Sequence, residues 1–132
     1  MEESAESVGH ARHYTVEQAN AALPWVSDRL ARIRDALGEL LSPESARALE
    51  LIDTDDGGGY PGRAAAGATL ALMAAASELQ AVDVVLRDPQ SGLIDFPSIR
   101  DGEEVYLCWR PGEDRVAWWH EPEAGFAGRR PL

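Results

Sequence analysis

The side chains best suited to chemistry gather in the last third of the chain, residues 92–132 (GLIDFPSIRDGEEVYLCWRPGEDRVAWWHEPEAGFAGRRPL). His120 lies there after two tryptophans, and six acids can approach it: Asp95, Asp101, Glu103, Glu104, Glu121 and Glu123. A neutral imidazole together with carboxylates suits zinc, iron or manganese. The segment therefore predicts a divalent metal site formed by His120, Asp95 and one or more of Glu121, Asp101 and Glu123.

The same residues also permit simpler arrangements. The spacing of His120 and the acids matches no defined metal-ligand motif, and His120 can instead be a partly buried histidine held by one carboxylate. Asp95 can instead cap a turn or pair with Arg129 or Arg130. The two arginines can clamp an anionic ligand through paired hydrogen bonds. They can also neutralise acids of their own chain, in which 12 Lys and Arg face 23 Asp and Glu.

A β-hairpin is predicted to carry His120. The strand-like segments EEVYLCWR and RVAWWHE flank the turn residues PGED. A tight turn at Gly112 and Glu113 places Arg110 opposite Arg115. Because side chains alternate between the faces of a strand, Cys108 then lies on the face opposite to His120. This register disfavours a joint Cys/His site. Cys108, which stands between Leu107 and Trp109, is expected to be packed and not reactive. One face carries Val105, Leu107, Trp109, Val116, Trp118 and His120, and the other carries Tyr106, Cys108, Ala117 and Trp119.

Two long helices are expected to support this hairpin. TVEQ, at Thr15 to Gln18, is a capping box, and apolar residues recur every three or four positions from Val16 to Leu40. Pro24 should kink this helix. Residues 42–52 (SPESARALELI) predict a short helix, and the alanine-rich segment from Arg63 to about Val82 predicts a second long helix packed closely on the first.

The length of the first helix predicts an unusual shape. Residues 16–41 would form a helix roughly 39 Å long, whereas a compact chain of this size has a radius of gyration of about 14 Å. The molecule is therefore either an elongated helical hairpin or a hairpin whose apolar seam continues against a second copy of the chain.

The remaining segments complete a single domain. Residues 1–12 are polar and aperiodic and predict a disordered tail. DTDDGGGYPG, residues 53–62, predicts a loop, and VDVVLRD, residues 82–88, predicts the start of a strand. The domain spans residues 13–132, with a helical hairpin at about 16–82 and a β segment at about 84–132.

Composition excludes several classes of protein. The net charge of -11 opposes binding to nucleic acids and to anionic membranes. A single cysteine permits no intramolecular disulfide and is typical of a reducing compartment. The sequence shows neither a signal peptide nor an apolar stretch long enough to span a bilayer. We therefore expect a cytoplasmic protein.

Five sequence segments, ANAALP, GLIDFP, LCWRPGE, WHE and GFAGRRPL, resemble the uncharacterised bacterial family DUF2203 over residues 14–132. The resemblance implies a small cytosolic protein with two long helices and a short β segment, and it implies no established activity. VDVVLRD departs from the family pattern, which resembles LGVEVKD. Asp83 stands where a glycine is usual, and Arg87 where a lysine is usual.

Together these features predict an α+β protein with two antiparallel helices and a small antiparallel sheet. The function predicted is a non-enzymatic interaction or regulatory module, built on the helical hairpin and forming a homodimer or binding another protein. The alternative is a protein that binds a divalent metal, zinc, iron or manganese, around His120, with a metal-dependent hydrolase as its extension. The sequence shows no nucleophile beside a base and no nucleotide-binding loop, and it leaves enzymatic activity undecided.

Overall fold

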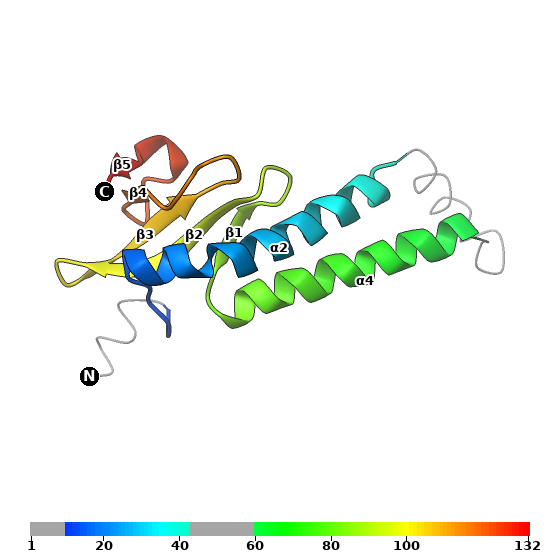
Figure 1. Ribbon diagram of the computed structural model, residues 1–132, viewed down its shortest axis with the longest axis horizontal. Coiled ribbons are helices and arrows are strands. Elements are labelled where there is room, and N and C mark those ends of the chain that lie inside the picture. Colours follow the sequence, from blue (N-terminus) through cyan, green and yellow to red (C-terminus); the bar gives the residue numbers. More distant parts are fainter. Residues whose placement is uncertain (1–9, 43–59) are drawn as a thin grey trace.

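The chain forms one layer of helices and one layer of β-sheet, in a computed structural model that describes residues 10–42 and 60–132 (Figure 1). Helices α2 and α4 run antiparallel beside the sheet, which confirms the predicted α+β class. The elements are α2 (Val16–Leu40), α4 (Tyr60–Ala81), β1 (Val85–Asp88), β2 (Leu93–Arg100), β3 (Glu103–Trp109), β4 (Trp118–His120), the 3-10 helix η2 (Phe126–Gly128) and β5 (Arg130–Pro131).

Helix α2 begins as its sequence predicts. The Thr15 side chain accepts a hydrogen bond from the Gln18 backbone, and the Gln18 side chain accepts one from the Thr15 backbone. The helix continues through Pro24 to Leu40, and the kink at Pro24 stays a prediction. The short helix predicted at residues 42–52 and most of the predicted tail lie outside the described residues, apart from Ser42 and residues 10–12.

The two helices pack through the stripes that the sequence predicts. Ala19, Val26, Leu30 and Ile33 of α2 are buried, and Leu23 and Leu37 pack beside them. Helix α4 contributes small residues, which let the two backbones approach closely. Its buried hydrophobic residues include Ala65, Ala68, Ala75 and Leu79.

The sheet is an antiparallel meander with the strand order β1-β2-β3-β4-β5. The predicted strand in VDVVLRD is confirmed as β1, but β2 and β5 were not predicted. Strand β2 pairs with β3 over its last seven residues, from Ile94 opposite Trp109 to Arg100 opposite Glu103. Asp101 and Gly102, both with positive φ, form the two-residue turn between them.

One face of the sheet packs on the helices and forms the core. Ile94, Phe96, Leu107 and Trp109 belong to one buried cluster with the apolar stripe of α2. Polar contacts fix the two layers in register. Asn20 bridges them, because its Oδ1 accepts a hydrogen bond from the Val116 backbone N–H at 2.9 Å. The opposite face of the sheet points away from the helices.

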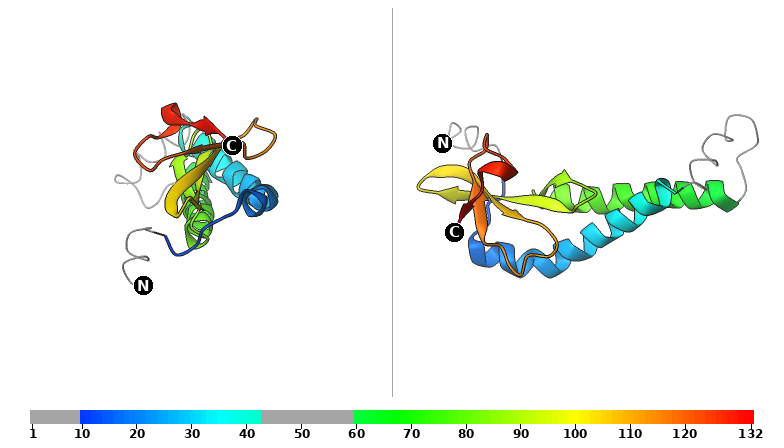
Figure 2. Two further views of the ribbon diagram at one scale, coloured as in Figure 1. Left: turned by 90° about the vertical axis from the view of Figure 1, so that its left-hand side faces the viewer. Right: turned by 90° about the horizontal axis from the view of Figure 1, so that it is seen from above.

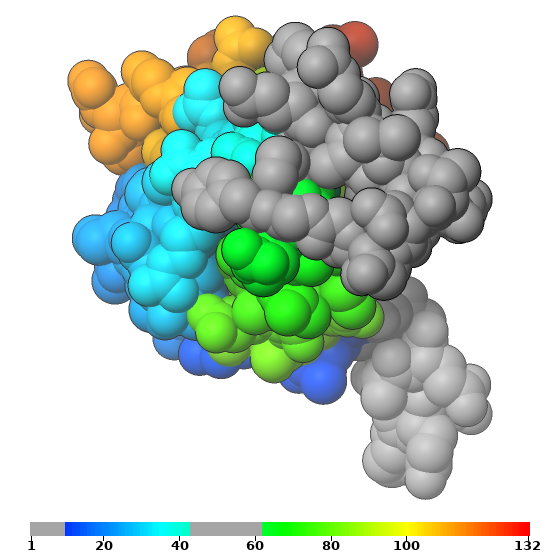
Figure 3. All heavy atoms as spheres, turned by 90° about the vertical axis from the view of Figure 1, so that its right-hand side faces the viewer, coloured from blue at the N-terminus to red at the C-terminus, as the bar shows by residue number. Residues whose placement is uncertain are grey.

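The helical hairpin extends well past the sheet, so the molecule is elongated (Figures 1 and 2). The end of the hairpin remote from the sheet shows α2 and α4 side by side (Figure 3). This shape agrees with the predicted length of the first helix. Among the described residues, no helix has the length and apolar character needed to cross a membrane.

Candidate functional site

The register between β3 and β4 differs by one residue from the predicted register. Tyr106 pairs with His120, Leu107 with Trp119 and Cys108 with Trp118. A shift of one residue moves every side chain of a strand to the other face. The prediction that Cys108 and His120 lie on opposite faces is therefore wrong. The cause is the connection over residues 110–117, which makes turns and bends instead of the tight two-residue turn that was assumed.

The corrected register brings together Asp95, Cys108 and His120 on the sheet face remote from the helices. They come from the neighbouring strands β2, β3 and β4, and Asp95 lies directly opposite Cys108. One potential ligand atom from each of the three lies within 4.8 Å of the others. All three are buried, with exposed fractions of 1% for Asp95 and Cys108 and 2% for His120. We call these three residues the buried triad.

Hydrogen bonds hold two members of the buried triad in place. Asp95 Oδ2 accepts a hydrogen bond from Arg87 Nε at 2.8 Å and lies 2.9 Å from His120 Nε2. The other ring nitrogen, His120 Nδ1, lies 2.7 Å from the backbone carbonyl oxygen of Glu121. Asp95 Oδ1 is buried and has no hydrogen-bond partner among the described residues. The carboxylate thus has one oxygen held by Arg87 and one oxygen whose nearest available donor is the weak thiol of Cys108.

Aromatic and cationic groups surround the triad. The Tyr106 ring lies 5.6 Å from the His120 ring, and the Arg87 guanidinium lies 4.9 Å from the centre of the Tyr106 ring. Burial raises the pKa of the Cys108 thiol to about 12, and the neighbouring Asp95 charge adds to the rise. In the absence of a bound cation the thiol is protonated at neutral pH, so Cys108 by itself is a poor nucleophile.

A small cavity reaches the triad from the surface. Its volume is about 210 Å³. Asp95, Cys108 and His120 line it together with Arg87, and the segment before and within η2 closes the other side. The residues contributed by that segment are Pro122, Glu123, Gly125 and Phe126.

The predicted metal ligands divide between two places. Asp95 and His120 meet as predicted, whereas Asp101 and Glu121 line a separate open cavity of about 940 Å³. Glu123 lines both cavities. Asp101 forms the β2–β3 turn, and this position explains its distance from the triad.

The two arginines proposed as an anion clamp contact acids of their own chain. Arg129 pairs with Glu113 and stacks on Trp118 and Phe126, with its guanidinium 4.7 Å and 4.5 Å from the two ring centres. Arg130 lies 3.9 Å from Glu121. Asp95 therefore pairs with Arg87 instead of either arginine.

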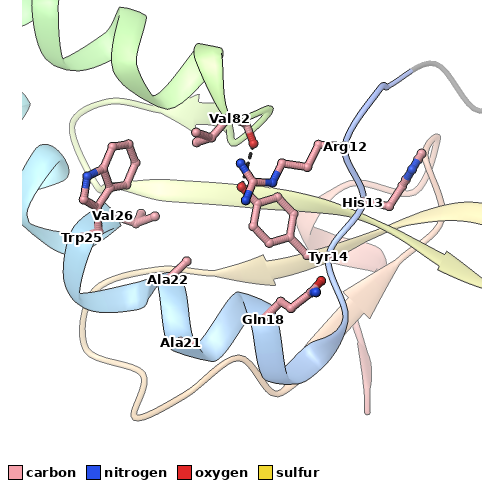
Figure 4. A pocket seen from close by; sticks show the side chains of 9 residues that line it. All are labelled: Arg12, His13, Tyr14, Gln18, Ala21, Ala22, Trp25, Val26 and Val82. Atoms are coloured by element: carbon pink, nitrogen blue, oxygen red, sulfur yellow. Dashed lines mark hydrogen bonds between the residues drawn. The ribbon is translucent and has the colours of Figure 1, made fainter.

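A further hollow of about 430 Å³ lies where residues 12–14 meet the start of α2 (Figure 4). Tyr14 points into this region, and its hydroxyl donates a hydrogen bond to the Val82 carbonyl at 2.6 Å. Trp25 and Val26 line the far side. Among the described residues, the lining of this hollow includes no acidic side chain and shares no residue with the lining of the cavity beside the triad.

Sequence reasoning missed Cys108 and Arg87 as members of the site. One available signal would have placed Cys108 near Asp95. The Asp101–Gly102 dipeptide is typical of a two-residue hairpin turn. This turn puts Arg100 opposite Glu103, and counting back along the strands then puts Asp95 opposite Cys108, as observed.

The segments that resemble DUF2203 also build the triad. GLIDFP supplies Asp95, LCWRPGE supplies Cys108 and WHE supplies His120. Comparison with curated proteins finds no match, and neither does comparison with solved structures. The family model described as "Uncharacterized conserved protein (DUF2203)" matches residues 12–132, and the chain therefore belongs to this family.

Proposed function

We propose that this protein is an interaction module that forms a homodimer through the exposed side of α4. The observation that carries this proposal is a wholly uncharged surface on a helix that projects from the domain. We call this surface the α4 outer face. It consists of Ala66, Gly67, Leu70, Met73, Ala74 and Ser77, which recur at helical spacing and are all exposed.

The α4 outer face exposes two large apolar side chains. Leu70 is 67% exposed and Met73 is 60% exposed. No charged residue lies between Arg63 and Glu78 in the sequence. Exposed helix faces of monomeric proteins usually carry charged side chains, so an uncharged face supports a role in contact with another protein.

The charges at the two ends of this face favour a second copy as the partner. Arg63 lies at one end and Glu78 at the other. In a two-fold antiparallel pairing of two α4 helices, Arg63 of each copy approaches Glu78 of the other. The same pairing brings the small residues Gly67 and Ala74 opposite each other and leaves room for Leu70 near the axis. Glu78 already pairs with Arg29 Nε at 2.9 Å, so the partner's Arg63 would join an existing ion pair.

Sedimentation velocity over a range of protein concentrations tests the proposal. The wild-type chain should form a dimer. Leu70→Glu places a charge in the apolar contact and should raise the Kd of the dimer at least tenfold, which corresponds to about 1.4 kcal/mol. Leu41→Glu is the matched control, because Leu41 is 66% exposed but lies beyond α2 and outside the α4 outer face. Both variants add one negative charge. A wild-type chain that stays monomeric at all concentrations contradicts the proposal.

The second candidate function is metal binding at the sheet face remote from the helices. The buried triad favours it, since a histidine, a carboxylate and a thiol converge there. Glu121 and Asp101 line another cavity, so the donor set must differ from the one predicted from the sequence. Hydrolysis at such a metal remains the extension of this candidate.

A further inference from the structure

We propose that Asp95, Cys108 and His120 bind one divalent metal ion of the zinc class, through one Asp95 carboxylate oxygen, Cys108 Sγ and His120 Nε2. This inference rests on the second candidate function and specifies its ligands and metal class. It is independent of the proposed dimer, because the triad lies on the sheet and the α4 outer face lies on a helix. Either proposal can fail without the other.

The contacts of His120 call for a cation beside Nε2. The Glu121 carbonyl oxygen can only accept a hydrogen bond, so Nδ1, which lies 2.7 Å from it, must carry a proton. In a neutral imidazole Nε2 then presents a lone pair. That lone pair points at the carboxylate of Asp95, another acceptor, at 2.9 Å. Two facing acceptors repel each other unless a cation lies between or beside them, and this cation is either a second proton on the ring or a metal ion.

The backbone contact of His120 is itself typical of a metal ligand. Histidines that bind metals usually donate their other ring N–H to a carbonyl or carboxylate, which fixes the tautomer and the ring orientation. Here the Glu121 carbonyl takes this role, and Tyr106 packs on the ring from one side. His120 is therefore oriented before any metal arrives.

The Oδ1 atom of Asp95 favours the metal over the proton. A proton on Nε2 satisfies Oδ2 but leaves the buried Oδ1 with no donor other than the weak thiol of the neighbouring Cys108. Buried polar atoms in folded proteins nearly always have a partner. A metal ion bound to the carboxylate supplies one, while Arg87 keeps hold of Oδ2 at 2.8 Å. Arg87 then acts as a positioning residue that orients the carboxylate.

Cys108 determines the class of metal. A thiolate and an imidazole suit zinc and other borderline ions, whereas magnesium and calcium prefer oxygen ligands only. On binding, the Cys108 thiol loses its proton to solvent and forms a sulfur–metal bond. One thiolate and one carboxylate then balance the two charges of the ion. Zinc bonds of about 2.0 to 2.3 Å are compatible with donors within 4.8 Å of one another after small side-chain rotations.

The cavity beside the triad leaves one coordination position open. Three protein ligands with an open fourth position are typical of reactive zinc sites, whereas structural zinc sites are closed by four protein ligands. Water or Glu123, which lines the same cavity of about 210 Å³, can occupy that position. The positive charge of Arg87 on the cavity wall favours a small anionic ligand there.

Titration of chelator-treated protein with Co²⁺ tests the proposal without requiring any activity. Thiolate ligation produces a sulfur-to-cobalt charge-transfer band in the near ultraviolet, which water and carboxylates do not. We expect the band to saturate at one Co²⁺ per chain and to disappear when Zn²⁺ is added in competition. Elemental analysis of protein purified without chelators should find zinc or a similar ion.

Two variants test the ligands Cys108 and Asp95, and a third is the control. Cys108→Ser should abolish the charge-transfer band, and Asp95→Asn should weaken Zn²⁺ affinity by more than the 10- to 100-fold typical of a lost outer-sphere contact. His13→Gln is the matched control. His13 also contacts a carboxylate, with Nε2 3.0 Å from Glu104 Oε2, but it lies outside the triad. The His13→Gln variant should bind one Co²⁺ per chain and should keep the Zn²⁺ affinity of the wild-type protein.

Two results would overturn the proposal. In the first result, wild-type protein that is folded by circular dichroism binds neither Co²⁺ nor Zn²⁺. Its ¹⁵N NMR spectrum then shows both ring nitrogens of His120 protonated. In that case the cation beside Nε2 is a proton. The other is an equal loss of metal binding in His13→Gln and in Cys108→Ser, which would place the metal elsewhere.

Discussion

Where the helices meet the sheet, single residues contact several elements at once. Tyr14 shows this most clearly. Its backbone N–H donates to the Pro97 carbonyl, its own carbonyl accepts from the Ser98 hydroxyl, and its side-chain hydroxyl donates to the Val82 carbonyl. The ring itself is buried against Phe96. One residue thus ties together the strand β2, the start of α2 and the end of α4.

Tyr14 gives a prediction about alkaline pH. Burial raises the pKa of its hydroxyl above the usual value of 10.0, and the Asp83 charge adds to the rise while Arg12 opposes it. The unfolded chain releases this proton at a lower pH than the folded chain does, so the free energy of unfolding is unaffected well below pH 10 and decreases as pH rises past it. Urea unfolding from pH 8 to 11 measures this. Tyr14→Phe should be less stable at pH 8 but should show a shallower decline, and an equal slope in both proteins contradicts the assignment.

A departure from the family pattern has a structural explanation at the same scale. Asp83 has a φ of 62°, in the left-handed region that favours glycine. Glycine is the residue usual at this position in the family pattern. The Asp83 carboxylate accepts a hydrogen bond from the Arg12 backbone at 3.1 Å and lies 3.5 Å from His10. These contacts offset the cost of the backbone conformation, and glycine could not make them.

At the scale of elements, two glycines differ in whether a larger residue could replace them. Gly38 lies in α2, and a Cβ placed there meets nothing within 4 Å. Gly92 lies in the β1–β2 turn with φ at 81°, and a Cβ there would lie 2.8 Å from Pro111 Cγ. The first glycine is therefore replaceable, and the second is required by the approach of the 110–117 connection to the turn.

This difference predicts opposite effects for the same substitution. Gly38→Ala should stabilise the protein by about 0.5 to 1 kcal/mol, because alanine loses less backbone entropy in a helix. Gly92→Ala should destabilise it by more than about 1 kcal/mol, because positive φ and the contact with Pro111 both oppose a side chain. Thermal unfolding of the two variants measures both. A stabilising effect at position 92 would show that the turn is looser than described.

At the scale of the whole molecule, one core joins both layers. The buried cluster contains Leu30 and Ile33 of α2, Leu79 of α4, and Phe96 and Leu107 of the sheet. Neither layer by itself can keep this apolar surface away from water. The far part of the helical hairpin, by contrast, extends past the sheet, with α2 and α4 beside each other (Figure 2).

The shared core predicts cooperative unfolding of metal-free protein. Far-ultraviolet circular dichroism reports mainly on the helices, and tryptophan fluorescence reports mainly on the sheet, which holds Trp109, Trp118 and Trp119. The two signals should change together over the same range of urea concentration, as expected of a two-state domain. An earlier transition by circular dichroism would mean that the hairpin melts as a separate unit.

Much of this architecture follows from the sequence alone because it depends on local patterns. The capping box sets the start of α2, the three- and four-residue spacing of apolar side chains sets the helix seams, and β-branched residues set β1. These signals act between residues close in sequence, so they survive without knowledge of the fold. The presence of Asp95 and His120 in one candidate site was also predictable from their types and neighbours.

The tertiary structure decided which face each strand shows. Strand β4 has only three residues and follows an irregular eight-residue connection, so no turn chemistry fixes its register in the sequence. Packing of Trp119 toward the core and the bond from Val116 to Asn20 determine it instead. A difference of one residue moves His120 from the face opposite Cys108 to the same face. Long-range packing, and not local pattern, therefore places the thiol beside the imidazole.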